Sequence, residues 1–144
     1  MRLTAFTDFG LRVLMRLAGE PGRAFTTAEI ADEFSISRNH LTKVVGELAG
    51  AGYIETRRGA GGGFKLARPA QDITLGEVVR TLEQEQPLVE CFRFDGGSCV
   101  LTPRCRLKRK LAAAREVFLT ELARTTLADC AWPDSSRIRA RPAP

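Results

Sequence analysis

Three of the four cysteines of this sequence lie within fifteen residues, in the segment ECFRFDGGSCVLTPRC. Cys91, Cys99 and Cys105 follow the spacing Cys-x7-Cys-x5-Cys, which differs from the paired Cys-x2-Cys of a structural zinc ribbon and from the tight run of a ferredoxin. A loop with this spacing must wrap a group larger than one tetrahedral ion, and Gly96 and Gly97 allow it to turn. The pattern favours an iron–sulfur cluster, with a zinc site and structural or disulfide-forming cysteines as the alternatives.

Basic side chains surround the third of these cysteines. Cys105 is expected in the first turn of a long helix, where backbone N–H groups and the helix dipole favour a thiolate. Positive potential is added by Arg104, Arg106, Lys108, Arg109 and Lys110. Cys130, the fourth cysteine, lies twenty-five residues further on and is interpreted as a semi-buried thiol without a ligand role.

Length and composition restrict the class of protein. The 144 residues fit one domain, or one domain with an appended element, and 44% hydrophobic residues can build a core. A formal charge of +5 favours a polyanionic partner. The sequence has no visible secretory signal and no apolar run near the ~18 residues of a membrane span. We therefore expect a cytoplasmic protein without a membrane partner, a compartment in which clustered cysteines more often bind metal or do redox work.

The elements that must position the cysteines begin with a helix over residues 4–18. Its apolar stripe consists of Phe6, Phe9, Val13, Leu14 and Leu17, and Asp8, Arg12 and Arg16 lie off that stripe. A short helix capped by Thr26 or Thr27 follows, then a tight turn at 35–37. Ser37 can cap the next helix, in which Leu41, Val44, Val45 and Leu48 point inward. This pattern predicts a helix-turn-helix, although Ser35 stands where many such turns have glycine.

The second helix of this motif has the properties of a DNA-reading helix. Its start and outer face carry Arg38, Asn39, His40, Thr42 and Lys43. In a major groove, asparagine suits adenine, and basic residues suit guanine or phosphate. With a single histidine and no nucleophile–base motif in the sequence, we do not expect an enzyme.

Residues 53–67 predict a β-hairpin of the winged type. Two alternating segments flank the glycine-rich tip RGAGGG. This tip lacks the full G-x-G-x-x-G pattern and joins strand to strand, so a nucleotide-binding loop is disfavoured. We expect Arg57 and Arg58 to reach the minor groove or its phosphates, with the backbone at Gly61 close to the DNA.

The C-terminal half predicts two further helices. A short one has Val78, Val79 and Leu82 inward, and a long one over residues 103–130, capped by Thr102, has an apolar side formed by Leu107, Leu111, Ala114, Phe118 and Leu122. This apolar side is larger than the rest of a small protein could bury, which favours a homodimer joined through this helix. The expected division is a DNA-binding domain over 1–72, a cysteine loop (90–105) and dimerisation helix within 73–130, and a disordered tail over 131–144.

Together these segments resemble the NsrR/IscR group of bacterial iron–sulfur transcriptional repressors. The matching pieces are the start MRLTAFTDFGLRVLMRLA, the helix-turn-helix, the wing RRGAGGGF, the helix ITLGEVVRTLE and three cysteines before a long helix. The resemblance covers about residues 1–130. It implies a mostly α-helical fold, with a winged helix-turn-helix domain and a long C-terminal dimerisation helix. It also implies that dimers bind pseudo-palindromic operators with an affinity set by a cluster on the cysteine loop.

The same resemblance suggests a fourth ligand and a signal. IscR-like members use a histidine three residues after the third cysteine, but this sequence has Lys108 there. NsrR-like members use a carboxylate near the N-terminus of the partner subunit, and the matching residue is Asp8; the alternative for Asp8 is a surface pair with Arg12. Three cysteines and one carboxylate suit a 4Fe–4S cluster better than 2Fe–2S. The implied signal is nitric oxide, which would release the DNA.

Two other functions remain open from the sequence. One is a regulator of the same group that responds to iron–sulfur supply or redox state. The other is a metal-free DNA-binding module whose cysteines are structural or form a thiol switch.

Overall fold

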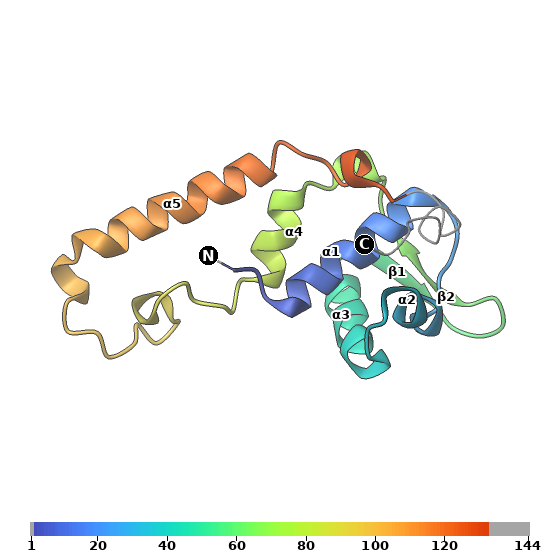
Figure 1. Ribbon diagram of the computed structural model, residues 1–144, viewed down its shortest axis with the longest axis horizontal. Coiled ribbons are helices and arrows are strands. Elements are labelled where there is room, and N and C mark those ends of the chain that lie inside the picture. The colour runs from blue at the N-terminus through green and yellow to red at the C-terminus, as the bar shows by residue number, and fades with distance from the viewer. Residues whose placement is uncertain (1, 133–144) are drawn as a thin grey trace, which may run out of the picture.

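The computed structural model describes residues 2–132, which form helices and one small hairpin (Figure 1). The helices are α1 (Ala5–Gly19), α2 (Thr27–Phe34), α3 (Arg38–Gly50), α4 (Leu75–Leu82) and α5 (Arg106–Leu122). Strands β1 (Ile54–Arg57) and β2 (Gly63–Leu66) form an antiparallel sheet. The predicted fold class, mostly α with a β-hairpin wing, is therefore confirmed. None of the described helices is long and apolar enough to cross a membrane.

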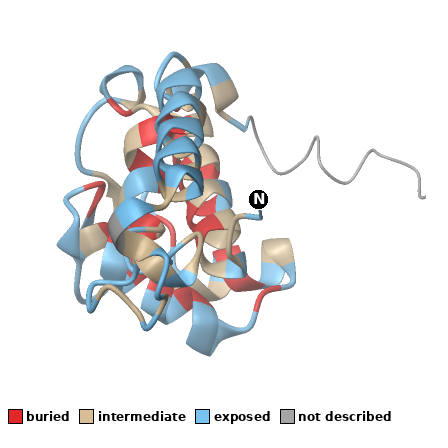
Figure 2. Ribbon diagram, turned by 90° about the vertical axis from the view of Figure 1, so that its left-hand side faces the viewer, coloured by how far each residue is buried: buried red, intermediate tan, exposed pale blue. Residues whose placement is uncertain are grey.

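The core lies where α1, α2, α3, α4 and the sheet meet. All the residues predicted to point inward on α3 and α4 are buried: Leu41, Val44, Val45, Leu48, Val78, Val79 and Leu82. From α1, Val13, Leu14 and Leu17 join them. Figure 2 shows the buried residues on the inner faces of the helices and the exposed ones outside. The 3.6-residue spacing of apolar side chains thus accounts for how these helices are oriented.

The helix-turn-helix depends on two caps and one unusual residue. Thr26 caps α2 in a capping box with Glu29, and the Ser37 side chain accepts the His40 N–H at 3.2 Å to begin α3. Between them Ser35 adopts φ 55°, in the left-handed region. The turn therefore requires the conformation for which glycine is usual, and the sequence meets it with serine.

The wing is anchored to the body by a one-residue extension of its sheet. Ile54 pairs with Leu66 and Arg57 with Gly63 in the antiparallel register. On the other side of β2, Phe25 forms a bridge to Phe64. A Cβ at position 63 would lie 2.5 Å from the Phe25 carbonyl oxygen, so only glycine allows the two chains to approach this closely.

Helix α5 extends away from the body and is shorter than the predicted helix over 103–130. It begins at Arg106, because a 3-10 turn, η3 (Thr102–Arg104), precedes it and Cys105 is its N-cap. It ends at Leu122, because the chain then turns back to the body. There Leu127 is fully buried and its N–H donates to the Ile73 carbonyl at 2.7 Å. The predicted disordered tail over 131–144 lies, from residue 133 onward, outside the described residues.

The C-terminal end of α5 packs on α4 at Gly76. A Cβ at this glycine would lie 2.5 Å from the Leu119 carbonyl oxygen and 2.7 Å from the Ala123 nitrogen. Leu119 is the buried residue of α5, whereas Leu107 and Val117 are 63% and 70% exposed. Two apolar side chains of α5 are therefore largely uncovered in the single chain, whereas Leu111, Phe118 and Leu122 are partly buried.

Candidate DNA interface and cysteine loop

The predicted DNA-reading residues lie at the start and on the outer face of α3. Arg38, Asn39, His40, Thr42 and Lys43 are all exposed. The Thr42 hydroxyl donates to the Arg38 carbonyl at 2.8 Å, and the His40 ring lies beside Phe9 of α1, with ring centroids 6.5 Å apart. The helix is thus fixed on its inner face and presents polar and basic groups outward, as groove recognition requires.

The wing tip presents a second polar and basic surface. Arg57, Arg58 and Gly61 are exposed, and the turn is closed by the Gly62 N–H donating to the Gly59 carbonyl at 2.9 Å. In Figure 1, α3 and the β1–β2 loop both lie along the lower side of the body, with α2 between them. A reading helix and a basic hairpin are therefore available on one side of the molecule.

The three cysteines occupy one loop but different local structures. Cys91 lies in the 3-10 turn η2 (Glu90–Phe92), Cys99 in the following loop, and Cys105 at the N-cap of α5, where its Sγ accepts the Lys108 N–H at 3.4 Å. All three are free thiols of intermediate exposure. Cys105 therefore precedes the first turn in which the sequence predicts it, but it meets the helix N–H groups that favour a thiolate.

Glu90, which the sequence does not single out, organises this loop. Its carboxylate accepts hydrogen bonds from the Ser98 N–H at 2.9 Å and the Ser98 hydroxyl at 2.6 Å. The same hydroxyl and N–H of Ser98 hold the pKa of Glu90 below its usual range. Gly96 and Gly97 have φ values of 76° and 61°, and a Cβ on Gly97 would lie 2.8 Å from the Glu90 carbonyl oxygen. The loop is a folded turn around this glutamate.

The thiols are not gathered into a finished site in the single chain. Among the described residues, no group of three histidine, cysteine, aspartate or glutamate side chains lies close enough to hold a metal ion. The donor chemistry nevertheless fits an iron–sulfur cluster, because three free thiols share one short loop. The loop also exposes the apolar side chains of Phe94, Val100 and Leu101. Cluster binding would thus require the loop to close or a second subunit to cover it.

Asp8 lies on α1, where it pairs with a neighbour on its own helix. Its carboxylate is 2.7 Å from the Arg12 guanidinium, and both side chains are about half exposed. This is the i,i+4 pair that the sequence offers as the alternative to ligation. Within one chain, the structure brings Asp8 to Arg12 and does not bring it to the cysteines.

The chain is similar to known transcriptional regulators. The Rrf2 family model, described as iron-dependent transcriptional regulator, matches residues 3–132. CymR (YrzC), the global cysteine regulator of B. subtilis, is 29% identical, with 91% of this chain and 96% of that chain covered and a TM-score of 0.71. Staphylococcus aureus CymR is 28% identical over 91% and 99%, with a TM-score of 0.68. T. potens IscR is 25% identical over 90% and 85%, with a TM-score of 0.68.

The family match extends over nearly all of the described residues, so it applies to the reading helix, the wing, the cysteine loop and α5 alike. Members of this family bind DNA, typically as dimers, and they are regulators rather than enzymes. The expectation of a non-enzymatic DNA-binding protein is therefore confirmed. The chain belongs to the Rrf2 family of transcriptional regulators.

Proposed function

We propose that this chain is a homodimeric repressor that holds an iron–sulfur cluster on its cysteine loop and releases operator DNA in response to nitric oxide. The observation that carries the proposal is the set of three partly exposed free thiols on one glutamate-organised loop at the start of α5. These three thiols are free and lie outside the hydrophobic core.

Cys91, Cys99 and Cys105 would hold the cluster. The N-cap position of Cys105 favours its thiolate, and the basic residues of the first turn of α5, Lys108 and Arg109 among them, balance the negative charge of the bound group. The group, once bound, would supply iron that nitric oxide binds strongly. Three thiolates and one carboxylate give one donor for each iron of a 4Fe–4S cluster, which we favour over 2Fe–2S.

Asp8 of the partner subunit is the proposed fourth ligand. Its carboxylate is accessible, and the ion pair that holds it is exposed, so exchanging Arg12 for another partner costs little. Asp8 precedes Phe9, whose ring lies beside His40 of the reading helix. Loss of the ligand bond at Asp8 would therefore take place next to the residue that contacts α3.

On DNA, each protomer would insert α3 into the major groove and place Arg57, Arg58 and the backbone at Gly61 on the minor groove or its phosphates. The dimer would match a pseudo-palindromic operator. The exposed apolar side chains of Leu107 and Val117 on α5 support pairing through this helix.

The test uses full-length protein purified without oxygen. Iron and acid-labile sulfide are measured, and nitric oxide is then titrated while binding to a duplex obtained by in vitro selection is followed. We expect a coloured protein that bleaches and releases DNA as nitric oxide is added. Cys99→Ser should abolish colour, and Cys130→Ser, the matched control outside the loop, should keep it. If Asp8→Ala leaves the cluster and the nitric oxide response unchanged, the fourth-ligand assignment is wrong.

A second candidate is a metal-free regulator whose cysteines form a thiol switch. Two observations favour it: the thiols are not gathered in the single chain, and one similar solved structure, 28% identical, is an oxidized form of Staphylococcus aureus CymR. Colourless protein that binds DNA and responds to a thiol oxidant would support this candidate. A protein with a cluster but no response to nitric oxide would instead support sensing of iron–sulfur supply or redox state.

A further inference from the structure

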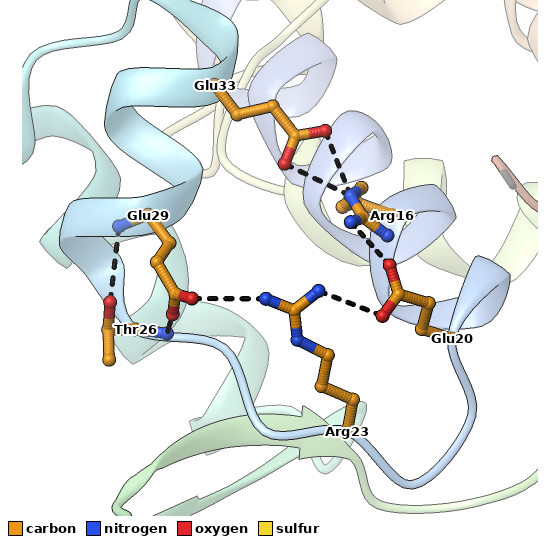
Figure 3. A network of polar contacts seen from close by, with 6 residues as sticks. All are labelled: Arg16, Glu20, Arg23, Thr26, Glu29 and Glu33. Atoms are coloured by element: carbon orange, nitrogen blue, oxygen red, sulfur yellow. Dashed lines mark hydrogen bonds and ion pairs between the residues drawn. The ribbon is translucent and has the colours of Figure 1, made fainter. Parts of the chain in front are cut away.

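A buried arginine joins the two helices beside the wing. Arg16 of α1 has a side chain only 1% exposed, although the sequence puts it off the apolar stripe. Its Nε donates to both carboxylate oxygens of Glu33 of α2, at 2.9 and 3.1 Å, and its Nη2 donates to Glu20 at 2.6 Å (Figure 3). Arg23 continues the network by binding Glu20 at 2.8 Å and Glu29 at 3.2 Å. The end of α1 is thus tied to Glu29 and Glu33 of α2 through the guanidiniums of Arg23 and Arg16.

The same guanidinium lies over the ring of the residue that pairs with the wing. The Arg16 Cζ is 4.6 Å from the centroid of Phe25, and the Arg23 Cζ is 4.3 Å from it. The Phe25 N–H donates to the Phe64 carbonyl at 2.9 Å, and the Phe64 N–H donates back at 2.8 Å. Phe25 is therefore an edge residue of the wing sheet and, through its ring, part of the arginine network.

The backbone of Phe25 is in close contact with the strand that leads to the wing tip. Gly63 lies against the Phe25 carbonyl so closely that any side chain there would clash. Gly63 in turn pairs with Arg57, the last residue of β1, and Arg58 follows directly. A displacement of the Phe25 backbone would therefore be passed to the two wing arginines through one pair of strands.

Stability alone does not account for burying this charge. Ion pairs taken out of water contribute little net stability, and apolar replacements are often neutral. In addition, Nη1 of Arg16 has no hydrogen-bond partner. A guanidinium, however, can offer its flat face to an aromatic ring while its edge binds two carboxylates, which a lysine ammonium cannot do. The Arg16 guanidinium therefore fixes the orientation of α1, α2 and the Phe25 ring relative to one another.

We propose that Arg16 is a positioning residue for the wing: by holding Phe25 it sets where Arg57 and Arg58 meet the DNA backbone relative to α3. The inference rests on the proposed DNA contact of the wing. It is independent of the cluster and of nitric oxide.

The test is a double-mutant comparison of Arg16→Lys and Arg58→Ala, made on the selected duplex over a range of salt concentrations. Removing one phosphate contact should reduce the slope of log K against log salt by ~0.9. We expect that loss when Arg58→Ala is introduced into the parent protein and a loss near zero when it is introduced into Arg16→Lys, since the wing is already displaced. The matched control is Arg80→Lys, which alters an exposed arginine–glutamate pair between α4 and α5. In that background Arg58→Ala should have its full effect.

The measured slopes distinguish the positioning role of Arg16 from the phosphate contact of Arg58. Equal slope losses from Arg58→Ala in the parent and in Arg16→Lys would overturn the positioning role while leaving the wing contact intact. No slope loss in the parent would mean that Arg58 touches no phosphate, and the inference would fail with that contact. Neither result bears on iron content or the nitric oxide response.

Amide hydrogen exchange provides a readout that a general loss of stability would not imitate. In Arg16→Lys, and in Phe25→Leu, which lacks the ring, the Phe64 N–H should exchange faster while the buried amides of α3 keep their protection. Faster exchange in both places would indicate unfolding of the whole body, and it would overturn the specific role proposed for Arg16.

Discussion

Replacing Gly76 by alanine tests how tightly α5 is seated on the body. In an open helix interior, glycine to alanine stabilises by ~1 kcal/mol because alanine has the higher helix propensity. At position 76 the added Cβ would lie 2.5 to 2.8 Å from Leu119 and from both the nitrogen and Cβ of Ala123. Two of these atoms are backbone and cannot swing away. The helices must separate by several tenths of an ångström at least, and overpacking of this kind costs ~1–3 kcal/mol net.

Gly46→Ala is the matched control, because Gly46 lies within α3 with nothing within 4 Å of its Cβ position. That variant should gain up to ~1 kcal/mol, so the two substitutions differ by ~2–4 kcal/mol with opposite signs. For a chain of this size each kcal/mol shifts Tm by ~3 °C.

The assay is urea unfolding followed by far-UV circular dichroism, at one fixed protein concentration because a dimer's stability depends on it. We expect a lower midpoint with an unchanged m-value for Gly76→Ala and a higher midpoint for Gly46→Ala. A Gly76→Ala protein as stable as its parent would refute the close approach of α4 and α5 at this glycine.

Three further predictions address the turn, the network and the dimer. Ser35→Gly should stabilise the protein by ~0.5 kcal/mol in thermal unfolding, because it relieves a left-handed serine. The Thr26 N–H that donates to Glu29 holds the pKa of that carboxyl below its usual range. Glu29→Gln should therefore lower stability by a few tenths of a kcal/mol at neutral pH, and that difference should vanish as pH falls through the lowered pKa, as urea midpoints from pH 7 to 3 would check. Leu107→Gln should weaken the dimer by more than ~100-fold in sedimentation equilibrium, since a symmetric interface loses two leucines, whereas Ala113→Gln, off the apolar side, should not.

Much of the DNA-binding half could be predicted from the sequence, because its signals are local. Ser37 caps α3 as expected, and the spacing of Leu41 and Leu48 identifies the buried face. The wing is indicated by alternation around a glycine-rich tip. Even Ser35, which departs from the usual glycine, adopts the conformation that the turn needs.

The features that could not be predicted from the sequence depend on contacts between segments far apart in the chain. The apolar spacing of α5 continues past Leu122 without glycine or proline, yet the helix ends there because Leu75 donates to the Thr125 carbonyl at 3.0 Å and Leu127 enters the core. Arg16 looks like a surface charge because its partners Glu33 and Phe25 belong to later elements. The three cysteines share one loop, yet their side chains are not gathered into a site within the described residues, which their spacing in the sequence does not reveal.

The attachment of α5 at only one of its ends limits how the chain can change in length. Just beyond its C-terminal end, the β-bridge between Thr74 and Thr126 attaches the chain to the body. Cys105 lies at the other end of the helix, ~25 Å away for 17 residues that each rise 1.5 Å. One inserted residue would turn the whole cysteine loop by ~100° about the helix axis while advancing it only ~1.5 Å. Insertions or deletions of about two full turns, ~7 residues, would return the thiols to the same side. Functional members of the family should therefore differ in the length of this helix by close to whole helical turns.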